Sequence, residues 1–260
     1  MPNAPESMRR TLSVALLVCL ACSVVVAGAA VGLKPTQVAN RQLDKQRNIL
    51  AIAGLADADA PASEVRQIFQ SRIRPRLVDL DSGRFSDAYP AEGFDPLKAA
   101  QDPALSQALP GDEDIASIRR REHYSVVYLV EDTQGKTETL ILPVRGYGLW
   151  STLHGFIALK NDYSTVQGFG FYQHGETPGL GGEVDNPRWK ALWPGKQVFN
   201  AEGSPVIRVA KGSADPASAH QVDGLAGATL TSNGVNNLLA FWLGSKGFGP
   251  LLTHLRTEEI

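Results

Sequence analysis

The sequence predicts an α+β protein in which a single N-terminal transmembrane helix is followed by a largely antiparallel sheet domain with flanking helices. Three observations support this prediction. A run of 23 residues without a charged side chain extends from Thr11 to Leu33. A series of β-rich segments begins at Tyr124, with few helical segments between them. The apolar residues between Val235 and Trp242 repeat with the spacing of one helix face.

The composition excludes several classes of protein. The 260 residues carry 25 basic and 27 acidic side chains, and no basic block is present that would follow a nucleic-acid backbone, so we expect no nucleic-acid partner. The two cysteines, Cys19 and Cys22, both lie in the apolar run. The rest of the chain therefore has neither a disulfide framework nor the cysteine ligands of a zinc site.

The apolar run is long enough to cross a bilayer, because 23 helical residues reach roughly 34 Å at about 1.5 Å per residue. A cleaved signal peptide is the alternative, since Arg9 and Arg10 form a basic start and small residues follow at 27–30. The apolar part of a signal peptide usually has only about 7–15 residues. The length therefore favours a retained anchor.

The charges around the run leave its orientation open. Two arginines precede it, whereas four basic residues follow it closely: Lys34, Arg41, Lys45 and Arg47. This count would keep the remainder of the chain in the cytoplasm. Long domains, however, are translocated largely regardless of charge.

Two helical segments and an irregular connection are predicted after the anchor. Residues 35–55 show an apolar helix pattern that ends at Gly54, and residues 61–80 continue as a helix until Pro75 breaks it. Residues 85–114 are rich in Pro, Gly, Asp and Ala and predict an irregular connection. We therefore divide the chain into an anchor (1–34), a juxtamembrane region (35–115) and a main domain (116–260).

The main domain is predicted to begin with a β-hairpin. Residues 124–132 and 137–146 are β-rich and flank the turn sequence TQGK. Further strands are expected at 154–160, 165–174 and 206–211, with a Gly/Pro-rich loop and a short helix around Trp189 between the last two. This order of elements differs from that of a doubly wound nucleotide-binding fold.

The simple catalytic and nucleotide-binding motifs are incomplete or absent in this sequence. GYGLWS at 146–151 has Ser151 where a dinucleotide fingerprint needs its third glycine, and no GK[ST] triplet exists. His174 and Glu176 in isolation resemble an acid/base pair, but no third group orients them. A solvated histidine beside a structural glutamate is the simpler interpretation.

The glycine-rich loop HGETPGLGG at 174–182 allows two interpretations. Its glycines let a backbone approach a ligand closely, and Leu149 and Trp150 offer apolar surface, a combination suited to a planar ring with polar edges. A pair of tight turns would explain the same residues. The residue types alone do not decide between the two.

The segment 223–235, DGLAGATLTSNGV, precedes the last predicted helix. Thr231 or Ser232 is a suitable N-cap, so the first backbone N–H groups of that helix would form an anion site near Thr229. Gly227 and Ala228 leave the hydroxyl of Thr229 accessible. A capped helix after a turn would need no ligand.

The residues Asp223 to Thr229 resemble the flavinylation motif of FMN-binding domains, in which FMN is joined through its phosphate to a threonine. GYGLWS, HGETPGLGG and GATLTSNGV, in this order and with the anchor and IRPRLVDLDSG at 73–83, resemble the C subunits of the Na+-translocating NADH:quinone reductases. The resemblance covers nearly the whole chain. Ala226 departs from it, because the family usually has Ser or Thr there. The expected effect is at most weaker recognition by the maturation machinery or altered hydrogen bonding.

The resemblance implies a flavoprotein that relays electrons toward quinone and has no catalytic residue or metal site of its own. Thr229 would carry FMN as a phosphoester, and Asp223 would serve recognition by the transferase or the geometry of the turn. The other FMN contacts that we expect are Leu149, Trp150, Ser151, Gly175, Glu176, Thr177, Gly179, Leu180, Gly227, Ala228 and Thr231. Residues 116–260 would then be the FMN-binding domain.

The resemblance also implies partners and a location. A flavin transferase would use FAD as donor and release AMP, and the other subunits of the complex and the lipid bilayer would be further partners. The chain would cross the bacterial inner membrane once, with its main domain in the periplasm.

Two alternatives remain open on the sequence alone. One is the homologous flavoprotein subunit of an Rnf-type ferredoxin:NAD+ oxidoreductase, although IRPRLVDLDSG and the long region before residue 120 favour the quinone reductase. The other is a membrane-tethered binding or scaffold domain without a cofactor.

Overall fold

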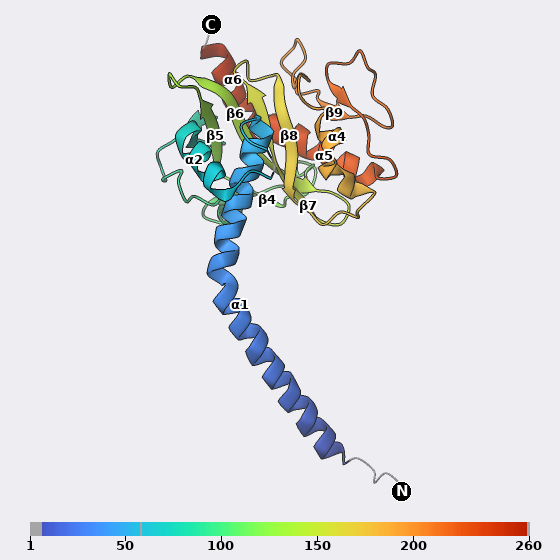
Figure 1. Ribbon diagram of the computed structural model, residues 1–260. Helices are drawn as coiled ribbons and strands as arrows, with labels where there is room; N and C mark the ends of the chain where they lie inside the picture. Colours follow the sequence, from blue (N-terminus) through green and yellow to red (C-terminus); the bar gives the residue numbers. More distant parts are fainter. Residues whose placement is uncertain (1–6, 58, 259–260) are drawn as a thin grey trace. The chain divides into compact units, whose positions relative to one another are not determined.

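The computed structural model of the chain describes residues 7–57 and 59–258. It separates into two compact units, Met1–Asp44 and Lys45–Ile260, which are considered one at a time (Figure 1). The second unit holds the sheet and begins well before residue 116. The proposed main domain, 116–260, is therefore part of a larger compact unit.

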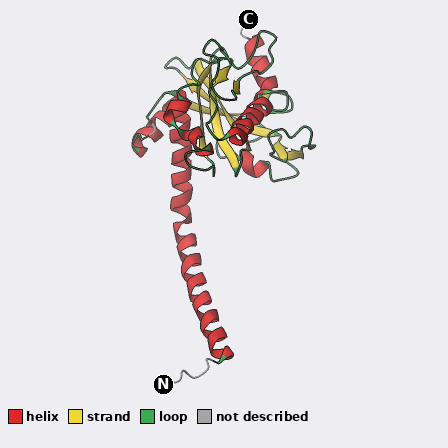
Figure 2. Ribbon diagram, turned by 90° about the vertical axis from the view of Figure 1, so that its right-hand side faces the viewer, coloured by secondary structure: helices red, strands yellow, loops and turns green. Residues whose placement is uncertain are grey.

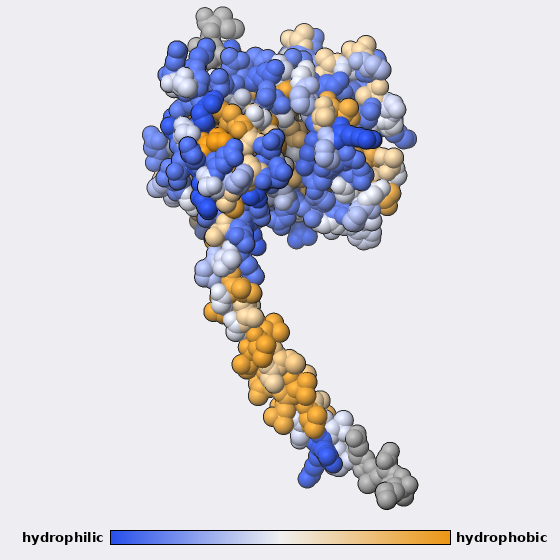
Figure 3. All heavy atoms as spheres, in the orientation of Figure 1, coloured by the Kyte–Doolittle hydropathy of each residue, from blue (hydrophilic) through white to orange (hydrophobic). Residues whose placement is uncertain are grey.

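The first unit is formed by helix α1 (Met8–Ala53), whose last turns belong to the second unit. Two separate helices were predicted here, but one continuous helix passes through Pro35. Within the described residues, α1 is the one helix long and apolar enough to cross a membrane. Figure 3 shows its apolar side chains as an uninterrupted exposed band.

The second unit is built on a six-stranded antiparallel sheet in the order β2-β1-β5-β6-β7-β8. The predicted hairpin and the two strands after it are confirmed. The strand bounds are β1 Ile73–Asp79, β2 Arg84–Phe85, β5 Tyr124–Glu131, β6 Thr137–Tyr147, β7 Thr152–Lys160 and β8 Val166–Gln173.

The predicted helix at 61–80 is only half correct. Helix α2 (Ala62–Arg72) ends before Pro75, and β1 then pairs with β5 from Ile73 to Asp79. The short strand β2 pairs only with Val78 and Asp79. Pro75 therefore pairs only with β5. Among the described residues, no strand lies on the other side of Pro75 that would need the backbone N–H that proline lacks. As a result, residues 35–115 supply a strand to the sheet.

Two of the remaining short elements, α3 (Pro96–Ala99) and β3 (Ser106–Ala108), lie where an irregular chain was predicted, and β4 (Arg120–Glu122) and the 3-10 helix η1 (Gly181–Asp185) were not predicted. Helix α4 (Pro187–Lys190) confirms the short helix predicted around Trp189. The strand predicted at 206–211 shrinks to β9 (Arg208–Val209), which pairs with β10 (Gln221–Val222) outside the main sheet. The C-terminal helix α6 (Gly249–Glu258) was not predicted.

Helices cover both faces of the sheet (Figure 2). On one face, α5 (Thr229–Leu243) buries the predicted apolar stripe, and Leu238 lies so close to Gly146 that a Cβ there would come within 2.6 Å of it. On the opposite face, the last turns of α1 and helix α2 bury Ile49, Leu50 and Val65. Burial of these side chains from water is the main force that holds the layers together.

Candidate functional site

Three segments that are distant in sequence meet at the N-terminal end of α5. They are the β6–β7 loop at 148–151, the glycine-rich loop after β8 at 174–182, and residues 225–232. These are the segments that the sequence predicted to lie near Thr229. Their close approach depends on one carboxylate and several glycines.

The carboxylate belongs to Glu176, whose residue is only 5% exposed. It accepts hydrogen bonds from the backbone N–H groups of Leu149 (3.1 Å), Trp150 (3.0 Å) and Ser151 (3.3 Å). Its other oxygen accepts the hydroxyl of Thr231 at 2.6 Å. Glu176 thus joins the β6–β7 loop to the first turn of α5.

These donors also determine the charge of Glu176. Burial opposes its ionisation, but the Thr231 hydroxyl and the three backbone N–H groups more than offset this, and they hold the pKa of Glu176 below its ordinary 4.5. The carboxylate is therefore ionised at neutral pH. Because it already has four donors of this chain, its role is to hold the loops in place.

Glycines make the junction possible by leaving room for neighbouring segments. A Cβ at Gly148 would lie 2.6 Å from the Glu176 carboxylate, and one at Gly181 would lie 2.5 Å from the Thr231 hydroxyl. A Cβ at Gly234 would lie 2.5 Å from the carbonyl oxygen of Tyr147. One of the two interpretations of the loop was that its glycines let a backbone approach a ligand. Gly181, however, is a glycine because a side chain there would collide with Thr231. Gly179 has φ +76° and open space around it.

Helix α5 begins earlier than predicted. Thr229 is its first residue and Ala228 occupies the N-cap position without a side-chain cap, so the prediction of Thr231 or Ser232 as N-cap is wrong. Gly227 has φ +68°, which lets the chain turn into the helix at this point. Thr231 and Ser232 are buried in the first turn, and Ser232 Oγ accepts the N–H of Leu225.

Thr229 is exposed, and its hydroxyl has no hydrogen-bond partner in the part of the chain that the structure describes. The first backbone N–H groups of a helix have no partner inside it, and the first turn of α5 contains no acidic residue. The end of α5 is therefore suited to hold an anion beside a free hydroxyl.

Exposed apolar side chains lie on the same three segments. They are Leu149 (38% exposed), Trp150 (66%), Leu180 (45%) and Leu230 (58%). Leu180 also lies against the motif, because a Cβ at Gly227 would be 3.0 Å from its Cδ2. Leu230 was not predicted, although its position off the apolar stripe of α5 could have revealed it. Such exposed apolar side chains are suited to packing a flat ring.

The hydroxyl of Ser151 and the turn after Thr177 shape the neighbouring loop. Ser151 Oγ accepts the N–H of Gly175 at 2.6 Å. The carbonyl oxygen of Thr177 accepts the N–H groups of Leu180 and Gly182, which closes the turn. Thr177 itself is exposed. A tight turn, of the kind that the sequence suggested as an alternative to ligand binding, is thus present in the loop, and it carries exposed residues.

His174 and Asp223 have structural partners. His174 contacts Asp185 at 2.6 Å and accepts the backbone N–H of Glu176, so the two side chains do not form an acid/base pair. The simpler interpretation is correct for Glu176, which is structural, but not for His174, whose side chain is only 13% exposed. Asp223 accepts the N–H of Ala214 at 2.8 Å, and its carbonyl oxygen accepts the indole N–H of Trp189. Asp223 thus ties the start of the motif to Ala214 and Trp189.

Comparison with known proteins locates this junction in a known family of domains. The model of the FMN-binding domain family matches residues 148–244, which include both loops and α5. The C subunit of the Na(+)-translocating NADH-quinone reductase of Pseudomonas aeruginosa is 67% identical over 257 residues, or 98% of each chain. The corresponding protein of Yersinia pestis is 52% identical over 98% of this chain and 96% of its own.

Two solved structures of such C subunits have a fold similar to that of this chain. The crystal structure of NqrC from Shewanella oneidensis is similar with a TM-score of 0.77 and 35% identity, covering 84% of this chain and 99% of that one. The crystal structure of the corresponding protein from Parabacteroides distasonis has a TM-score of 0.67 and 28% identity, and covers 85% of this chain and 97% of its own.

Proposed function

Because the chain belongs to the family of the C subunits of Na+-translocating NADH-quinone reductases, we propose that Thr229 carries FMN in a phosphoester bond within such a complex. The chain is one subunit of an oxidoreductase complex that transfers electrons, and its cofactor is FMN. The other subunits are its partners. The Rnf-type alternative is set aside, because the relatives at 67% and 52% identity are quinone-reductase subunits.

The observation that carries the proposal is the state of the Thr229 hydroxyl. It is exposed at the N-terminal end of α5, whereas the nearby hydroxyls of Thr231 and Ser232 are buried and hydrogen-bonded. A phosphodiester on Thr229 would keep one negative charge. The first N–H groups of α5 and the positive end of its dipole stabilise such a charge.

The residues around Thr229 suit the rest of the cofactor. The apolar side chains of Leu149, Trp150, Leu180 and Leu230 are exposed on the three segments that meet at the start of α5, where they would pack against a flat ring system. Gly175, Thr177 and Gly179 are exposed in the glycine-rich loop, and Gly227 and Ala228 directly precede Thr229, so their backbone would be available to the cofactor. Ser151, Glu176 and Thr231 act by holding these segments, since their own polar groups are engaged.

The chain and the cofactor have separate tasks. When bound, the isoalloxazine ring of FMN supplies the oxidation and reduction chemistry. The chain anchors it, shields it with apolar side chains and fixes its distance to a partner protein of the complex. No side chain at the site is required to transfer a proton, which agrees with a subunit that is not catalytic alone.

The proposal extends to the membrane. Residues 11–33 would span the inner membrane once in contact with lipid, as their exposed apolar side chains suggest, within an anchor segment of residues 1–34. Residues 35–115 would link the anchor to an FMN-binding domain at 116–260, and also supply strand β1 to its sheet. The domain would lie in the periplasm, where a flavin transferase would attach FMN.

In-gel flavin fluorescence of the denatured full chain, produced together with a flavin transferase, tests the attachment. Thr229→Ala removes the acceptor hydroxyl from an exposed position, so we expect a folded protein without fluorescence. Thr231→Ser keeps the hydroxyl that Glu176 needs and serves as the matched control, which should stay fluorescent. Fluorescence in Thr229→Ala would refute the proposal, and a wild-type chain without covalent flavin would favour the scaffold alternative.

A further inference from the structure

A second site lies on the face of the sheet opposite to α5. It is a cavity of about 830 Å³, which is within the range of small-molecule sites. Its floor is formed by Arg145 and His154, which are paired across β6 and β7. Side chains alternate along a strand, and Gly146 and Leu153 face α5, so the side chains of Arg145 and His154 leave these strands on the other side. The guanidinium of Arg145 reaches the last turn of α5, where it lies 5.0 Å from the centre of the Trp242 ring.

One end of this cavity adjoins the β6–β7 loop. Tyr147 and Thr152, the pair that precedes and follows the loop 148–151, form that end. The Tyr147 hydroxyl lies 3.4 Å from the carbonyl oxygen of Trp150. The cavity is thus separate from the anion site at Thr229, and its wall is continuous with the loop that Glu176 holds.

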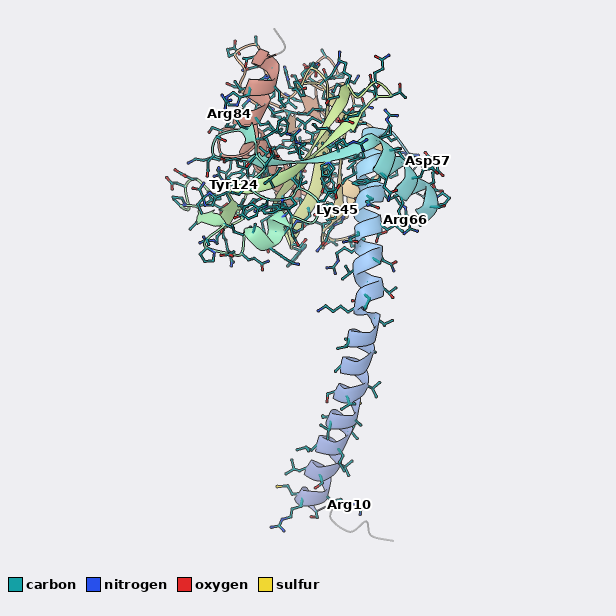
Figure 4. All side chains as sticks on the ribbon, turned by 90° about the vertical axis from the view of Figure 1, so that its left-hand side faces the viewer. Arg10, Lys45, Asp57, Arg66, Arg84 and Tyr124 are labelled. Carbon is teal, nitrogen blue, oxygen red and sulfur yellow. The ribbon has the colours of Figure 1, made fainter. Side chains whose placement is uncertain are left out.

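The other end leads inward to a second chamber of about 60 Å³, which shares Leu97, Arg145 and His154 with the first. Lys45, labelled in Figure 4, lines this chamber. Ser125 lines it too, and its hydroxyl is fully buried without a hydrogen-bond partner among the described residues. Buried hydroxyls are normally hydrogen-bonded, so the inner end is suited to a polar atom that this chain does not supply.

The two chambers are lined by four basic residues, Arg119, Arg120, Arg145 and Lys45, and by three acidic ones, Asp114, Asp95 and Glu122, so the lining carries a net positive charge. Glu122 is paired with Arg145, whereas Asp114 and Asp95 accept backbone N–H groups and keep their charge. Arg119 is an exposed residue at the rim of the cavity, and its guanidinium has no hydrogen bond or ion pair within the described residues.

Ring surfaces accompany this charge. Tyr147 is 47% exposed, and the imidazole of His154 lines both chambers with its ring 6.1 Å from that of Tyr172. Burial, and then the charge of Arg145, lowers the pKa of His154 below its ordinary 6.5. His154 is therefore neutral at pH 7 and offers one donor and one acceptor.

We propose that this cavity binds a small molecule that carries a carboxylate or phosphate group on a planar ring, with the anionic group on Arg119 and the ring against Tyr147 and His154. The ligand is distinct from the FMN on Thr229. The two sites share only the β6–β7 loop, so loss of one leaves the other intact.

Ligand-observed NMR titration of the full chain in detergent tests this proposal. Phenyl phosphate and benzoate probe the two anionic groups, and benzyl alcohol probes the ring without charge. We expect saturable binding of both anions and at least about tenfold weaker binding of the alcohol, since a charge-assisted contact is worth at least that factor.

Variants locate the site. Arg119→Gln should weaken both anions about tenfold, whereas Arg208→Gln, an exposed arginine on β9, should leave binding unchanged. Both variants should keep the covalent flavin fluorescence and the melting temperature of the wild type. These two measurements check that the variants are folded. Equal binding of benzyl alcohol, unchanged binding in Arg119→Gln, or no saturable binding of either anion would each overturn the proposal.

Discussion

The carboxylate of Glu176 accepts a 2.6 Å hydrogen bond from the hydroxyl of Thr231, which lies 55 positions further along the chain. The same carboxylate accepts backbone N–H groups from the β6–β7 loop. The position of α5, and with it the position of Thr229, is therefore coupled to two loops through one side chain.

Replacing this side chain tests the coupling. Glu176→Gln has the same size but places an amide N–H among donors, so we expect the free energy of unfolding to fall by about 2 kcal/mol. The absorption spectrum of the bound flavin should also shift, because the loops around Thr229 lose a common acceptor. Denaturant titration and spectroscopy of the full chain measure both effects. Glu202→Gln, in an exposed loop, is the matched control and should change neither.

The difference in unfolding free energy between the wild type and Glu176→Gln should depend on pH. The pKa of Glu176 is lower in the folded chain than its ordinary 4.5, so its contribution to stability is complete above that value and is lost as the pH falls through the folded pKa. The difference in unfolding free energy between wild type and Glu176→Gln should therefore shrink on acidification below about pH 4.5. A difference that stays constant down to about pH 3 would show that the charge of Glu176 has no part in it.

Packing of α5 against β6 predicts a strong effect at Gly234. A Cβ there would lie 2.5 Å from the carbonyl oxygen of Tyr147 and 2.9 Å from Cα of Gly148. Both contacts are with backbone, so Gly234→Ala must displace the helix, at a cost of about 1–3 kcal/mol. Thermal unfolding measures this cost. Gly111→Ala, where a Cβ meets nothing within 4 Å, is the control. Equal melting temperatures of the two variants would contradict the close contact.

The glycine-rich loop is tested at Gly179, which has φ +76° and no neighbour within 4 Å of a Cβ. A β-branched residue is strained in this conformation, so Gly179→Val should shift the loop and perturb the spectrum of bound FMN without unfolding the domain. Gly195→Val introduces the same strain at φ +85°, in the turn before Val198. It should leave the spectrum unchanged. If Gly179→Val also leaves it unchanged, the loop is not part of the flavin site.

The N-terminal helix is expected to stay in the mature protein. Its apolar stretch is longer than that of a signal peptide, and α1 continues without a break from Met8 into the second unit. N-terminal sequencing of protein purified from membranes should begin at or next to Met1. A sequence that begins near residue 31, after the small residues, would show that the segment is cleaved.

Local patterns in the sequence predicted those parts of the fold that local interactions determine. The strands β5 to β8 have continuous β-rich sequences, and the apolar spacing of α5 identified the face that is buried on the sheet. Strand β1 escaped prediction because it contains Pro75, which a short neighbouring strand tolerates. The N-cap of α5 was misplaced because the positive φ of Gly227 starts the helix before Thr231.

The candidate site was predictable only in part, for a different reason. The resemblance to a family brought the three segments together, and residue types indicated an accessible hydroxyl at Thr229. The role of Glu176 depends on donors that are 25 to 55 positions away, which no local pattern contains. The same holds for Gly148 and Gly181, whose neighbours come from other segments.

Peptide mass spectrometry of the full chain, produced together with a flavin transferase, tests the attachment of FMN to Thr229 most directly. Cleavage after Lys211 and Lys246 releases Thr229, Thr231 and Ser232 in one peptide. We expect this peptide to carry the mass of FMN and its fragment ions to place the modification on Thr229. A modification on Thr231 or Ser232, or an unmodified peptide, would contradict the assignment.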